Sequence, residues 1–398
     1  MKKETEKAVK SCLKNSTSLT ETAVLEVARS RLGQFLPLES DGYACTTGQL
    51  LDVLLAVSAQ KDTIEQVCAD LQIKVGAETI RGYFNAQLKV EKLFELQESV
   101  NLALQMSLNS DLKRQKLEVA IDFHDQSYYG KSEQAEGLWV GAEAKNGSDA
   151  SADRVATLYV IKNGHRLTLA IKFVLPNETA KEIVEYLLKQ MRRLEIKAKC
   201  LYLDRGFASM EIVRYLKESK QSTIVACPIR GKTGGLRALC VGRKSYRTKH
   251  VFKSAKHGAE EAEMAMFKGF TTKQRKGKKE RKAKWLAYIL VGCDEQTSAK
   301  KVKEKYRKRF GIEASYRCAK KVRGWTTSAN AAYRFMLLGM SFLLTNIWQE
   351  LQEQWTRKVQ VGRASWKWQK FRLKRFVNFL RKAIENLYGM VSQIEMLS

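Results

Sequence analysis

The order of β-rich and helical segments between residues 117 and 228 constrains the fold of this chain more than any other feature. The β-rich run LEVAIDFHD is followed by two β-branched runs that flank Asn163-Gly164, a dipeptide that strongly indicates a β-hairpin. A segment with helical periodicity, the strand KCLYLD, a second helix near residues 208–217 and the strand STIVACP complete the series. This order predicts a mixed five-stranded sheet in an α/β fold.

Two aspartates lie near the ends of strands in this predicted sheet. Asp122 belongs to the run AIDFHD, and Asp204 closes the run LYLD. A right-handed crossover can place the second of these strands beside the first. Open α/β sheets carry their ligands beyond the carboxyl ends of the strands. The two carboxylates can therefore face one site, in an arrangement of the ribonuclease H-like kind.

Changes in periodicity and charge predict five regions along the 398 residues. They are a helical N-terminal domain (1–112), the first part of the ribonuclease H-like core (113–228), a β-rich basic insertion (229–297), the rest of the core (298–350) and a basic helical C-terminal region (351–398). Within the core, residues 131–154 are rich in Gly, Ser, Ala and Asp and are expected to form a loop.

The N-terminal region contains a candidate helix-turn-helix that starts at Asp62. Two apolar stripes are separated by a short turn, which suits a motif that reads a DNA end. However, residues 1–110 carry 12 basic and 14 acidic side chains, so the region is not basic. A plain helical hairpin is therefore the alternative interpretation.

The net charge indicates a polyanionic partner. The chain has 71 Lys and Arg residues against 42 Asp and Glu, a formal charge of +29. This excess is far larger than solubility requires and is typical of proteins that bind nucleic acid. Because the first 110 residues carry a net charge of −2, the excess belongs to the remainder of the chain.

Two basic segments each allow two interpretations. The segment KQRKGKKERKAK, Lys273–Lys284, has eight basic residues and one acid, and is either a solvated loop or a phosphate contact. The segment WKWQKFRLKRF from Trp366 interleaves aromatic and basic residues. It is either an amphipathic helix that faces the core or a face that binds nucleic acid.

Other features exclude several classes of protein. The eight cysteines show no C-x-x-C pair, so structural zinc is not expected, and scattered reduced thiols favour a cytosolic protein. The N-terminus has no apolar segment of a signal peptide. The most apolar run, FMLLGMSFLLTNIW, is too short to span a bilayer and is expected to form a buried core helix.

The stretch YRKRFGIEASYRCAK places one acid within a very basic segment. At 100° per residue, one narrow helical stripe carries Tyr306, Arg309, Glu313 and Lys320. A solvent-exposed face with i, i+4 ion pairs is the ordinary explanation of such a stripe. With Asp122 and Asp204, however, Glu313 would provide three carboxylates, which suit a pair of Mg²⁺ ions because magnesium prefers oxygen ligands.

These residues carry a resemblance to a known family. The spacing Y-x2-R-x3-E-x6-K from Tyr306 matches the signature of DDE transposases of the insertion-sequence-four superfamily. LDRGF, which contains Asp204, resembles the second acidic motif of that superfamily, and AIDFHDQSYYG resembles the first in a form similar to the ISH subgroup. The resemblance covers about residues 115–350.

The resemblance implies roles for individual residues. Asp122, Asp204 and Glu313 would be the catalytic, metal-binding triad for two Mg²⁺ ions, for which Mn²⁺ can substitute. The implied DNA contacts are Tyr306, Arg309, Lys320, Arg205, which follows the second acid, and Trp285, which could hold a flipped base. The basic segment would add Lys273, Arg275, Lys276, Lys278 and Lys279.

The activity implied is cut-and-paste transposition of an insertion sequence by DNA cleavage and strand transfer. The partners would be double-stranded DNA, in the form of terminal inverted repeats and target DNA, and a second copy of the chain in a homodimer. No membrane partner is expected. The location implied is the cytoplasm and nucleoid of a prokaryote. A nuclease or resolvase without strand transfer and a domesticated, non-catalytic DNA-binding protein are the alternatives.

Three local details stay open in the sequence. Asp125 could compete with Asp122 as the first ligand. His124 is a neighbour of the site rather than a magnesium ligand, since imidazole suits softer metals. Gly311 in the middle of the predicted helix costs about 1 kcal/mol relative to Ala, so a bend is expected there.

Overall fold

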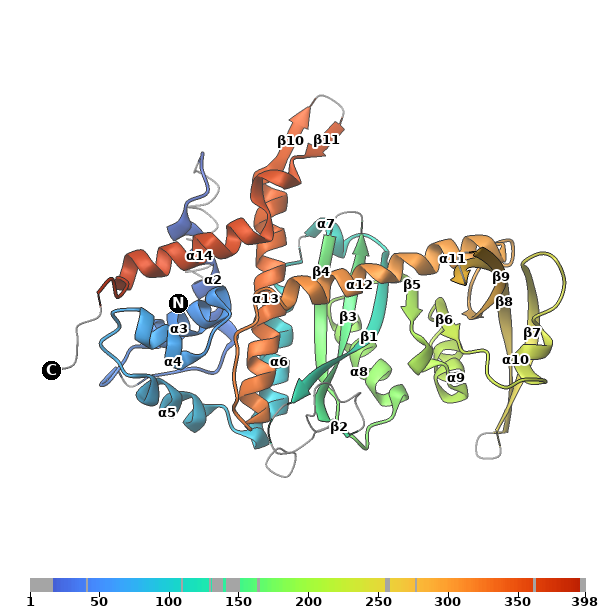
Figure 1. Cartoon of the computed structure of the whole chain (residues 1–398), viewed down its shortest axis with the longest axis horizontal. Coiled ribbons are helices and arrows are strands. Elements are labelled where there is room, and N and C mark those ends of the chain that lie inside the picture. Colours follow the sequence, from blue (N-terminus) through green and yellow to red (C-terminus); the bar gives the residue numbers. More distant parts are fainter. Residues whose placement is uncertain are drawn as a thin grey trace.

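The structure is a computed structural model that describes residues 17–40, 42–108, 110–128, 130, 139–140, 151–162, 165–254, 258–275, 278–360 and 363–393. Within them, a mixed sheet of nine strands extends from the middle of the molecule to one end in the order β2-β3-β1-β5-β6-β9-β8-β7, with β4 paired to β3 (Figure 1). Its strands are β1 (Leu117–Tyr128), β2 (Trp139–Val140), β3 (Ser151–Lys162), β4 (His165–Phe173), β5 (Ala198–Leu203), β6 (Thr223–Cys227), β7 (Tyr246–Ser254), β8 (Gly258–Arg275) and β9 (Lys278–Val291).

Five of these strands follow the order predicted from the sequence. β4, β3 and β1 are antiparallel neighbours, whereas β1, β5 and β6 are parallel. β3 and β4 pair up to Lys162 and His165, which confirms the hairpin predicted at Asn163-Gly164. The predicted loop 131–154 is wrong at Trp139–Val140, which form β2 and pair with β3. It is also wrong at its end, because residues from Ser151 onward already belong to β3 and pair with the extended end of β1. Residues 131–138 and 141–150 of that loop lie outside the described residues.

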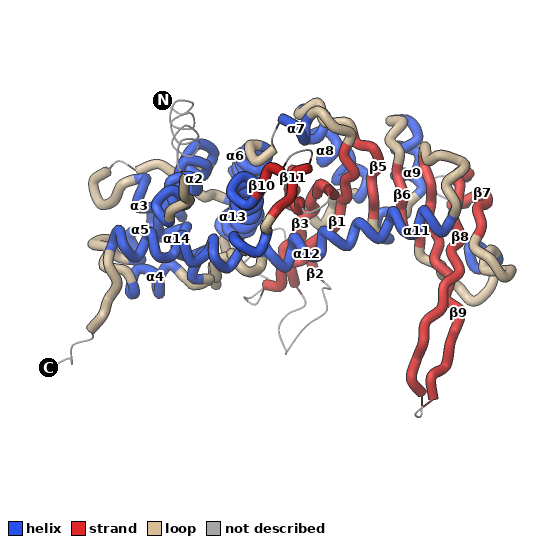
Figure 2. The backbone as a smooth tube through the Cα atoms, turned by 90° about the horizontal axis from the view of Figure 1, so that it is seen from above, coloured by secondary structure: helices blue, strands red, loops and turns tan. Residues whose placement is uncertain are grey.

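The segment predicted as a β-rich insertion continues the sheet. β9 pairs antiparallel with β6 from Thr223↔Val291 to Cys227↔Ala287, and β8 and β7 follow β9. The short helix α10 (Gly235–Ala238) precedes β7. The distal parts of β8 and β9 extend well beyond the body of the molecule (Figure 2).

The helices cover both faces of the sheet. On one face, apolar residues of α8 (Ala180–Arg193) and α9 (Met210–Glu218) share a buried cluster with β1, β5 and β6. On the other face lie α11 (Ala299–Arg307), the 3₁₀ turn η4 (Lys308–Phe310), α12 (Gly311–Ala319) and α13 (Ala331–Thr356). α11 and α12 run across the strands as one interrupted helix (Figures 1 and 2).

The N-terminal helices pack against α13 and the C-terminal helix rather than against the strands nearest the insertion. They are α2 (Glu21–Phe35), α3 (Thr47–Gln60), α4 (Ile64–Asp70), α5 (Ala77–Gln87), η1 (Val90–Lys92), α6 (Leu93–Gln105) and α7 (Ser110–Lys113). Thr20, Thr46 and Thr63 cap the first three of them through side-chain hydrogen bonds to backbone N–H groups. The helix pair predicted near Asp62 is present as α4 and α5.

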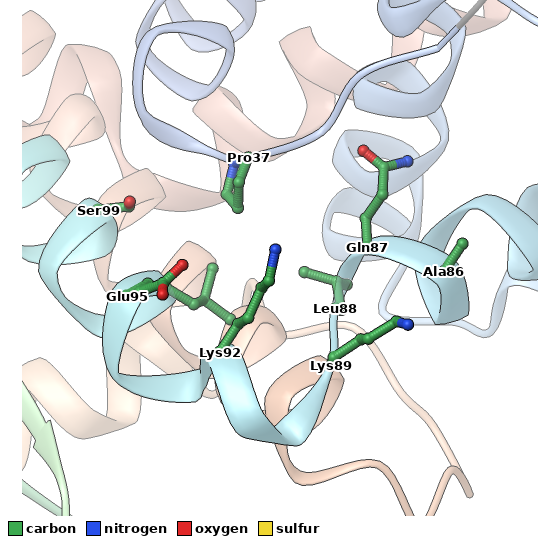
Figure 3. Close-up of a pocket in the computed structure, with 9 residues that line it drawn as sticks. Pro37, Ala86, Gln87, Leu88, Lys89, Lys92, Glu95 and Ser99 are labelled. Atoms are coloured by element: carbon green, nitrogen blue, oxygen red, sulfur yellow. The ribbon is translucent and has the colours of Figure 1, made fainter.

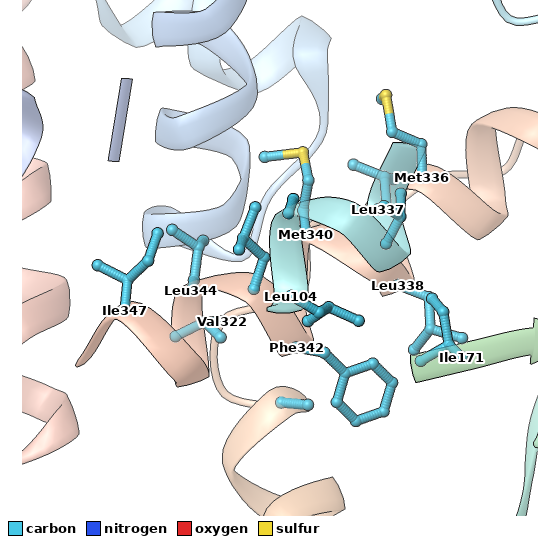
Figure 4. Close-up of a cluster of buried hydrophobic side chains, with 14 of the residues drawn as sticks. Leu104, Ile171, Val322, Met336, Leu337, Leu338, Met340, Phe342, Leu344 and Ile347 are labelled. Carbon is cyan, nitrogen blue, oxygen red and sulfur yellow. The ribbon is translucent and has the colours of Figure 1, made fainter. Parts of the chain in front are cut away.

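The most apolar run of the sequence forms the middle of α13, as predicted. Between Ala331 and Ile347 every residue of this helix is buried. Figure 4 shows Met340, Phe342 and Leu344 within a cluster that also contains Leu104 of α6 and Ile171 of β4. No helix in the described part of the chain combines the length and apolar character needed to cross a bilayer.

Amide side chains satisfy the outer edge of β4, which has no strand neighbour beyond β3 among the described residues. Asn101 of α6 accepts from the Ile171 N–H (2.7 Å) and donates to the Ile171 carbonyl (3.0 Å). Gln97 accepts from the Phe173 N–H (2.6 Å). Asn346 of α13 accepts from the Thr168 N–H and donates to the Thr168 carbonyl. The edge strand is thereby buried without leaving these backbone groups unpaired.

The C-terminal region begins with a small hairpin, β10 (Arg357–Gln360) and β11 (Arg363–Trp366), that projects from the end of α13 (Figure 1). The turn η5 (Trp368–Phe371) and α14 (Leu373–Tyr388) follow. Phe371, Leu373 and Phe376 are buried, and α14 packs on α2 and α3. The structure therefore supports the core-facing interpretation of the segment from Phe371 onward.

Candidate active site

The two predicted aspartates lie side by side. Ile121 of β1 is the register partner of Leu203 of β5, so Asp122 and Asp204 come next on two adjacent parallel strands, which are about 4.8 Å apart. Asp122 points to the sheet face covered by α11 and α12, because side chains alternate along the strand and Ile121 packs on the opposite face. The strand pairing therefore brings the two carboxylates to one place.

Arg309 of η4 bridges both carboxylates. Its Nη1 donates to Asp122 Oδ2 at 2.7 Å, and its Nη2 lies 3.5 Å from Asp204 Oδ1. The residue is only 6% exposed, and its buried Nε–H has no hydrogen-bond partner among the described residues. A guanidinium thus compensates two acids that would otherwise repel each other, and one of its buried donors has no acceptor among the described residues.

The environment shifts the acidity of Asp122. Burial raises the pKa of its carboxyl to about 6, the Arg309 charge opposes this rise, and the negative charge of Asp204 adds to it. Burial raises a carboxyl pKa because the charged form loses hydration. Asp122 is therefore partly protonated in mildly acidic solution.

Tyr306 of α11 closes the site from the side of β5. It is 5% exposed, and its hydroxyl lies 3.2 Å from the Leu203 carbonyl and 3.3 Å from Asp204 Oδ1. Its ring packs edge-on against Tyr202, one residue before Leu203. The tyrosine thus fixes the end of β5 and donates toward the acid that follows it.

Glu313 and Lys320 lie on the same helical series but on its exposed side. Ile312, Tyr316 and Ala319 bury the opposite face, and the Tyr316 hydroxyl hydrogen-bonds Thr157 (2.6 Å) and the Asp122 carbonyl (3.2 Å). Within the described residues, no group of three or more His, Cys, Asp or Glu side chains is arranged to hold a metal. The structure therefore brings Tyr306, Arg309 and the two aspartates together, and leaves Glu313 outside the cluster.

The 3₁₀ turn η4 interrupts the helical series and ends one residue before Gly311, whereas the bend expected there stays a prediction. A Cβ at Gly311 would approach the Tyr159 hydroxyl to 3.3 Å. The glycine thus lets the helix lie close to β3. This close approach places Arg309 at the level of the carboxylates.

The two residues left open beside Asp122 have other partners. Asp125 forms a two-pronged ion pair with Arg154 of β3, at 2.6 and 2.7 Å. His124 is buried and stacks on Tyr316, with ring centroids 4.6 Å apart. Burial lowers the pKa of His124 to about 4, and the charges of Lys320 and Arg323 lower it further. Neither side chain is directed to the carboxylate pair by these contacts.

Comparison with known proteins places this chain in a family. Residues 114–346, more than half of the chain, match the family model described as the transposase DDE domain. The chain belongs to the DDE transposase family. A search of curated proteins found no match. Among solved structures, the chain is similar to a piggyBac transposase in a synaptic complex with hairpin DNA, with a TM-score of 0.55 and 8% identity over 94% of this chain and 78% of that chain. At this identity the likeness concerns the fold.

In this transposase, Asp204 opens onto a basic pocket of about 630 Å³. Asp204, Tyr306, Arg309 and Trp285 all line it. Its basic lining residues are Arg205, Arg237, Lys284, Lys303, Arg307 and Arg309. Trp285 is half-buried, contacts Tyr246 edge-on, and has the Lys268 ammonium 5.5 Å from its ring centroid. The pocket thus combines an aromatic wall with positive charge beside a carboxylate.

The basic segment of the transposase lies in the projecting ribbon of β8 and β9 (Figure 2). Lys273 and Arg275 belong to β8, and Lys278 and Lys279 belong to β9. Lys276 lies outside the described residues. The described part of the segment therefore forms a two-stranded ribbon rather than a loop, and the phosphate contact stays a prediction.

A second pocket lies among the N-terminal helices, apart from these residues. It has a volume of about 370 Å³ and is formed by Pro37 and the junction of α5 and α6. In Figure 3, Lys92 points toward the middle of this group, with Glu95 beside it. None of the predicted site residues lines it.

Sequence reasoning missed the pairing of Arg309 with both acids. The helical stripe assigned Arg309 to phosphate binding, and nothing in the stripe shows how deeply the helix lies on the sheet. The burial of Ile312 and the close approach at Gly311 determine that depth. The available signal for this pairing was an arginine one helical turn before Glu313. Which acid such an arginine pairs with depends on the tertiary structure.

Proposed function

We propose that this chain is a DNA transposase of the insertion-sequence-four type that cleaves DNA at the ends of its element and joins the cleaved ends to a target. The observation that carries the proposal is the adjacent pair Asp122 and Asp204, placed by strand register in a chain of the DDE transposase family. The strand order β4-β3-β1-β5-β6 supports a ribonuclease H-like core.

Divalent metal ions fit the donor set of this site. The Asp122 and Asp204 oxygens are the hard donors that Mg²⁺ or Mn²⁺ prefers, and Arg309 already holds positive charge between them. We assign Glu313 as the third ligand, reached through a shift of η4 and α12 when DNA binds. Two ions held there would activate the attacking oxygen and stabilise the leaving oxygen in an in-line displacement.

The remaining residues of the pocket position DNA. Arg205, Lys284, Lys303 and Arg307 are placed to neutralise phosphates beside Asp204. The Nε–H of Arg309 is buried and unpartnered, and the same shift of η4 would let it donate to a phosphate oxygen. Lys320 extends this contact along α12. Trp285 offers a ring on which an extruded base can stack. A dimer on paired inverted repeats would let each copy act on one end.

Substitution of the three acids tests the proposal. Asp122→Asn, Asp204→Asn and Glu313→Gln are each expected to lower Mg²⁺-dependent cleavage of the element's own end DNA by more than about 100-fold, since even residues that only orient metal ligands contribute 10–100-fold. Cleavage is measured on labelled end DNA on denaturing gels. Glu304→Gln, another exposed acid on the same helical series, is the matched control and should cleave normally.

The outcome separates the alternatives. Normal cleavage by any one of the three variants removes that residue from the triad. Cleavage without joined products, when pre-cleaved ends and target DNA are supplied, would instead indicate a nuclease or resolvase. Binding of end DNA without cleavage in Mg²⁺ or Mn²⁺ would indicate a non-catalytic DNA-binding protein.

A further inference from the structure

Trp325 is a rigidly mounted but exposed aromatic residue in the segment between α12 and α13. It is 57% exposed. The backbone on either side is held: Val322 is fully buried, and a Cβ at Gly324 would overlap Val57 of α3. The Trp325 backbone N–H also donates to the Asp62 carbonyl at 3.0 Å. The surrounding structure thus fixes this residue without covering its ring.

The ring borders a small cleft at the end of β1. The cleft has a volume of about 140 Å³, and its lining includes Gln126 and Tyr128 of β1, Arg323 and Arg334. Gln126 follows Asp122 by four residues on the same strand, or about 13 Å at 3.3 Å per residue. We take the flank to keep its base stacking, so that it advances about 3.4 Å per nucleotide as one strand of B-form DNA does. The distance then corresponds to about four nucleotides.

The charge around the cleft favours a phosphate backbone. The sequence from Lys320 to Trp325 contains Lys320, Lys321 and Arg323 and no acid. Two of the neighbouring acids are compensated, since Asp125 pairs with Arg154 and Asp153 pairs with Arg334 at 2.6 and 2.9 Å. The Asp62 carboxylate accepts a hydrogen bond from the Thr63 N–H. Positive charge beside an exposed aromatic ring is the combination that binds single strands of nucleic acid.

The cleft and the basic pocket lie on opposite sides of Asp122 in the sheet. The pocket is lined by residues that follow β5 and β6 and by β9, whereas the cleft is formed by the end of β1 and the start of α13, which packs on β4. A DNA strand held in the pocket and cleaved at the aspartates would leave the site toward Trp325.

We propose that Trp325 stacks on a nucleobase of the DNA that flanks the element, about four nucleotides beyond the cleaved bond, with Lys320, Lys321 and Arg323 holding the adjoining phosphates. This proposal rests on the proposed function, because it takes the aspartate pair as the point of cleavage. Trp325 is here a binding residue for the flank and takes no part in bond breaking.

Photo-crosslinking tests the position directly. End DNA carrying a flank of about eight unpaired nucleotides, with 5-iododeoxyuridine at one flank position at a time, is bound to the full-length Asp122→Asn protein and irradiated. We expect the strongest crosslink to map to the peptide with Trp325, from a position about three to five nucleotides beyond the cleavage site. A maximum at any other peptide for all flank positions overturns the proposal.

Affinity measurements test the contribution of the ring. Trp325→Ala is expected to weaken binding of flanked DNA by about 5- to 100-fold, which corresponds to one stacked base, and to leave binding of DNA that stops at the cleavage site unchanged. Trp325→Phe should restore most of the loss. An abasic nucleotide at the crosslinked position should weaken the wild type to the level of Trp325→Ala and weaken that variant no further.

The controls separate this inference from its alternatives. Phe94→Ala, which removes a ring on α6 from a residue that is 47% exposed, should bind both DNAs normally. An equal loss of affinity for flanked and flush-ended DNA in Trp325→Ala would assign Trp325 a structural role. A changed sedimentation coefficient with unchanged DNA affinity would assign it to contact with another protein. Cleavage of the same DNA by the wild type is scored separately, so a failure of catalysis does not count against the stacking site.

Discussion

At the scale of single residues, the central fact is that a buried guanidinium lies between two carboxylates. Arg309 contacts Asp122 at 2.7 Å and is 3.5 Å from Asp204. Even so, burial and the second acid leave the pKa of Asp122 raised to about 6. The folded protein therefore carries a cost for the charged form of this acid, as is common where a site is arranged for binding rather than for stability.

This cost predicts a pH dependence in the protein without metal. Because the pKa of Asp122 is higher in the folded chain than the ordinary value of 3.8, the folded state binds the extra proton between these values. This extra proton stabilises the folded state, and the stabilisation is lost as pH rises through about 4 to 6. The free energy of unfolding then falls by on the order of 3 kcal/mol. Relative to Asp122→Asn, the wild type should lose this amount between pH 4 and pH 7.

Urea denaturation in EDTA at several pH values measures this difference. Asp125→Asn is the control, because it removes from the same strand a carboxylate that is paired with Arg154. Parallel pH profiles for the wild type and Asp122→Asn would show that Arg309 fully compensates the buried charge.

At the scale of elements, local sequence patterns predicted the strands and helices, whereas pairings between distant residues determine how the strands are arranged in the sheet. Asn163-Gly164 and the alternation in LEVAIDFHD are local signals, and the hairpin and β1 follow them. The pairing of β9 with β6 joins residues 60 to 68 positions apart, and no local pattern in the sequence indicates it. The pairing of β8 with β9 across KQRKGKKERKAK has no periodic signal either. A charge run suggests a loop, because strand formation there depends on the partner strand rather than on residue preference.

The β8–β9 ribbon provides a prediction about affinity. Replacement of residues 272–281 by Asn-Gly, a two-residue hairpin turn, removes the distal cross-strand pairs from Thr272↔Arg281 to Arg275↔Lys278. DNA affinity should fall, and the dependence of log K on log salt should become shallower by about 0.9 for each phosphate that the shortened ribbon no longer neutralises. Thermal stability should stay nearly unchanged, because these pairs lie beyond the buried core.

Fluorescence anisotropy at several salt concentrations checks this expectation. A full-length ribbon with its basic residues changed to Gln should reproduce the shallower salt dependence if charge, rather than ribbon length, binds DNA. An unchanged slope in both variants would exclude the ribbon from the interface.

At the scale of the whole molecule, one buried cluster joins the N-terminal helices, α13, α14 and one face of the sheet. The amide side chains along β4 strengthen this connection, since Gln97 and Asn101 come from α6 and Asn346 comes from α13. The sequence could not indicate this arrangement: an Asn within an apolar helix has no visible partner until the strand edge is placed against it. The helical segment predicted as a separate domain therefore shares its core with the sheet.

A shared core predicts cooperative unfolding. Asn101→Ala leaves both the N–H and the carbonyl of Ile171 without their partner, which should lower the free energy of unfolding by about 2 to 5 kcal/mol. All seven tryptophans lie at or beyond Trp139, so their fluorescence follows the later part of the chain, whereas far-ultraviolet circular dichroism also follows the N-terminal helices. Both signals should shift together in Asn101→Ala, while Asn85→Ala on the exposed face of α5 should change stability by less than about 0.5 kcal/mol. A shift of the dichroism transition alone would mean that the N-terminal helices unfold independently, and the amide contacts to β4 would then be too weak to couple those helices to the sheet that carries the aspartate pair.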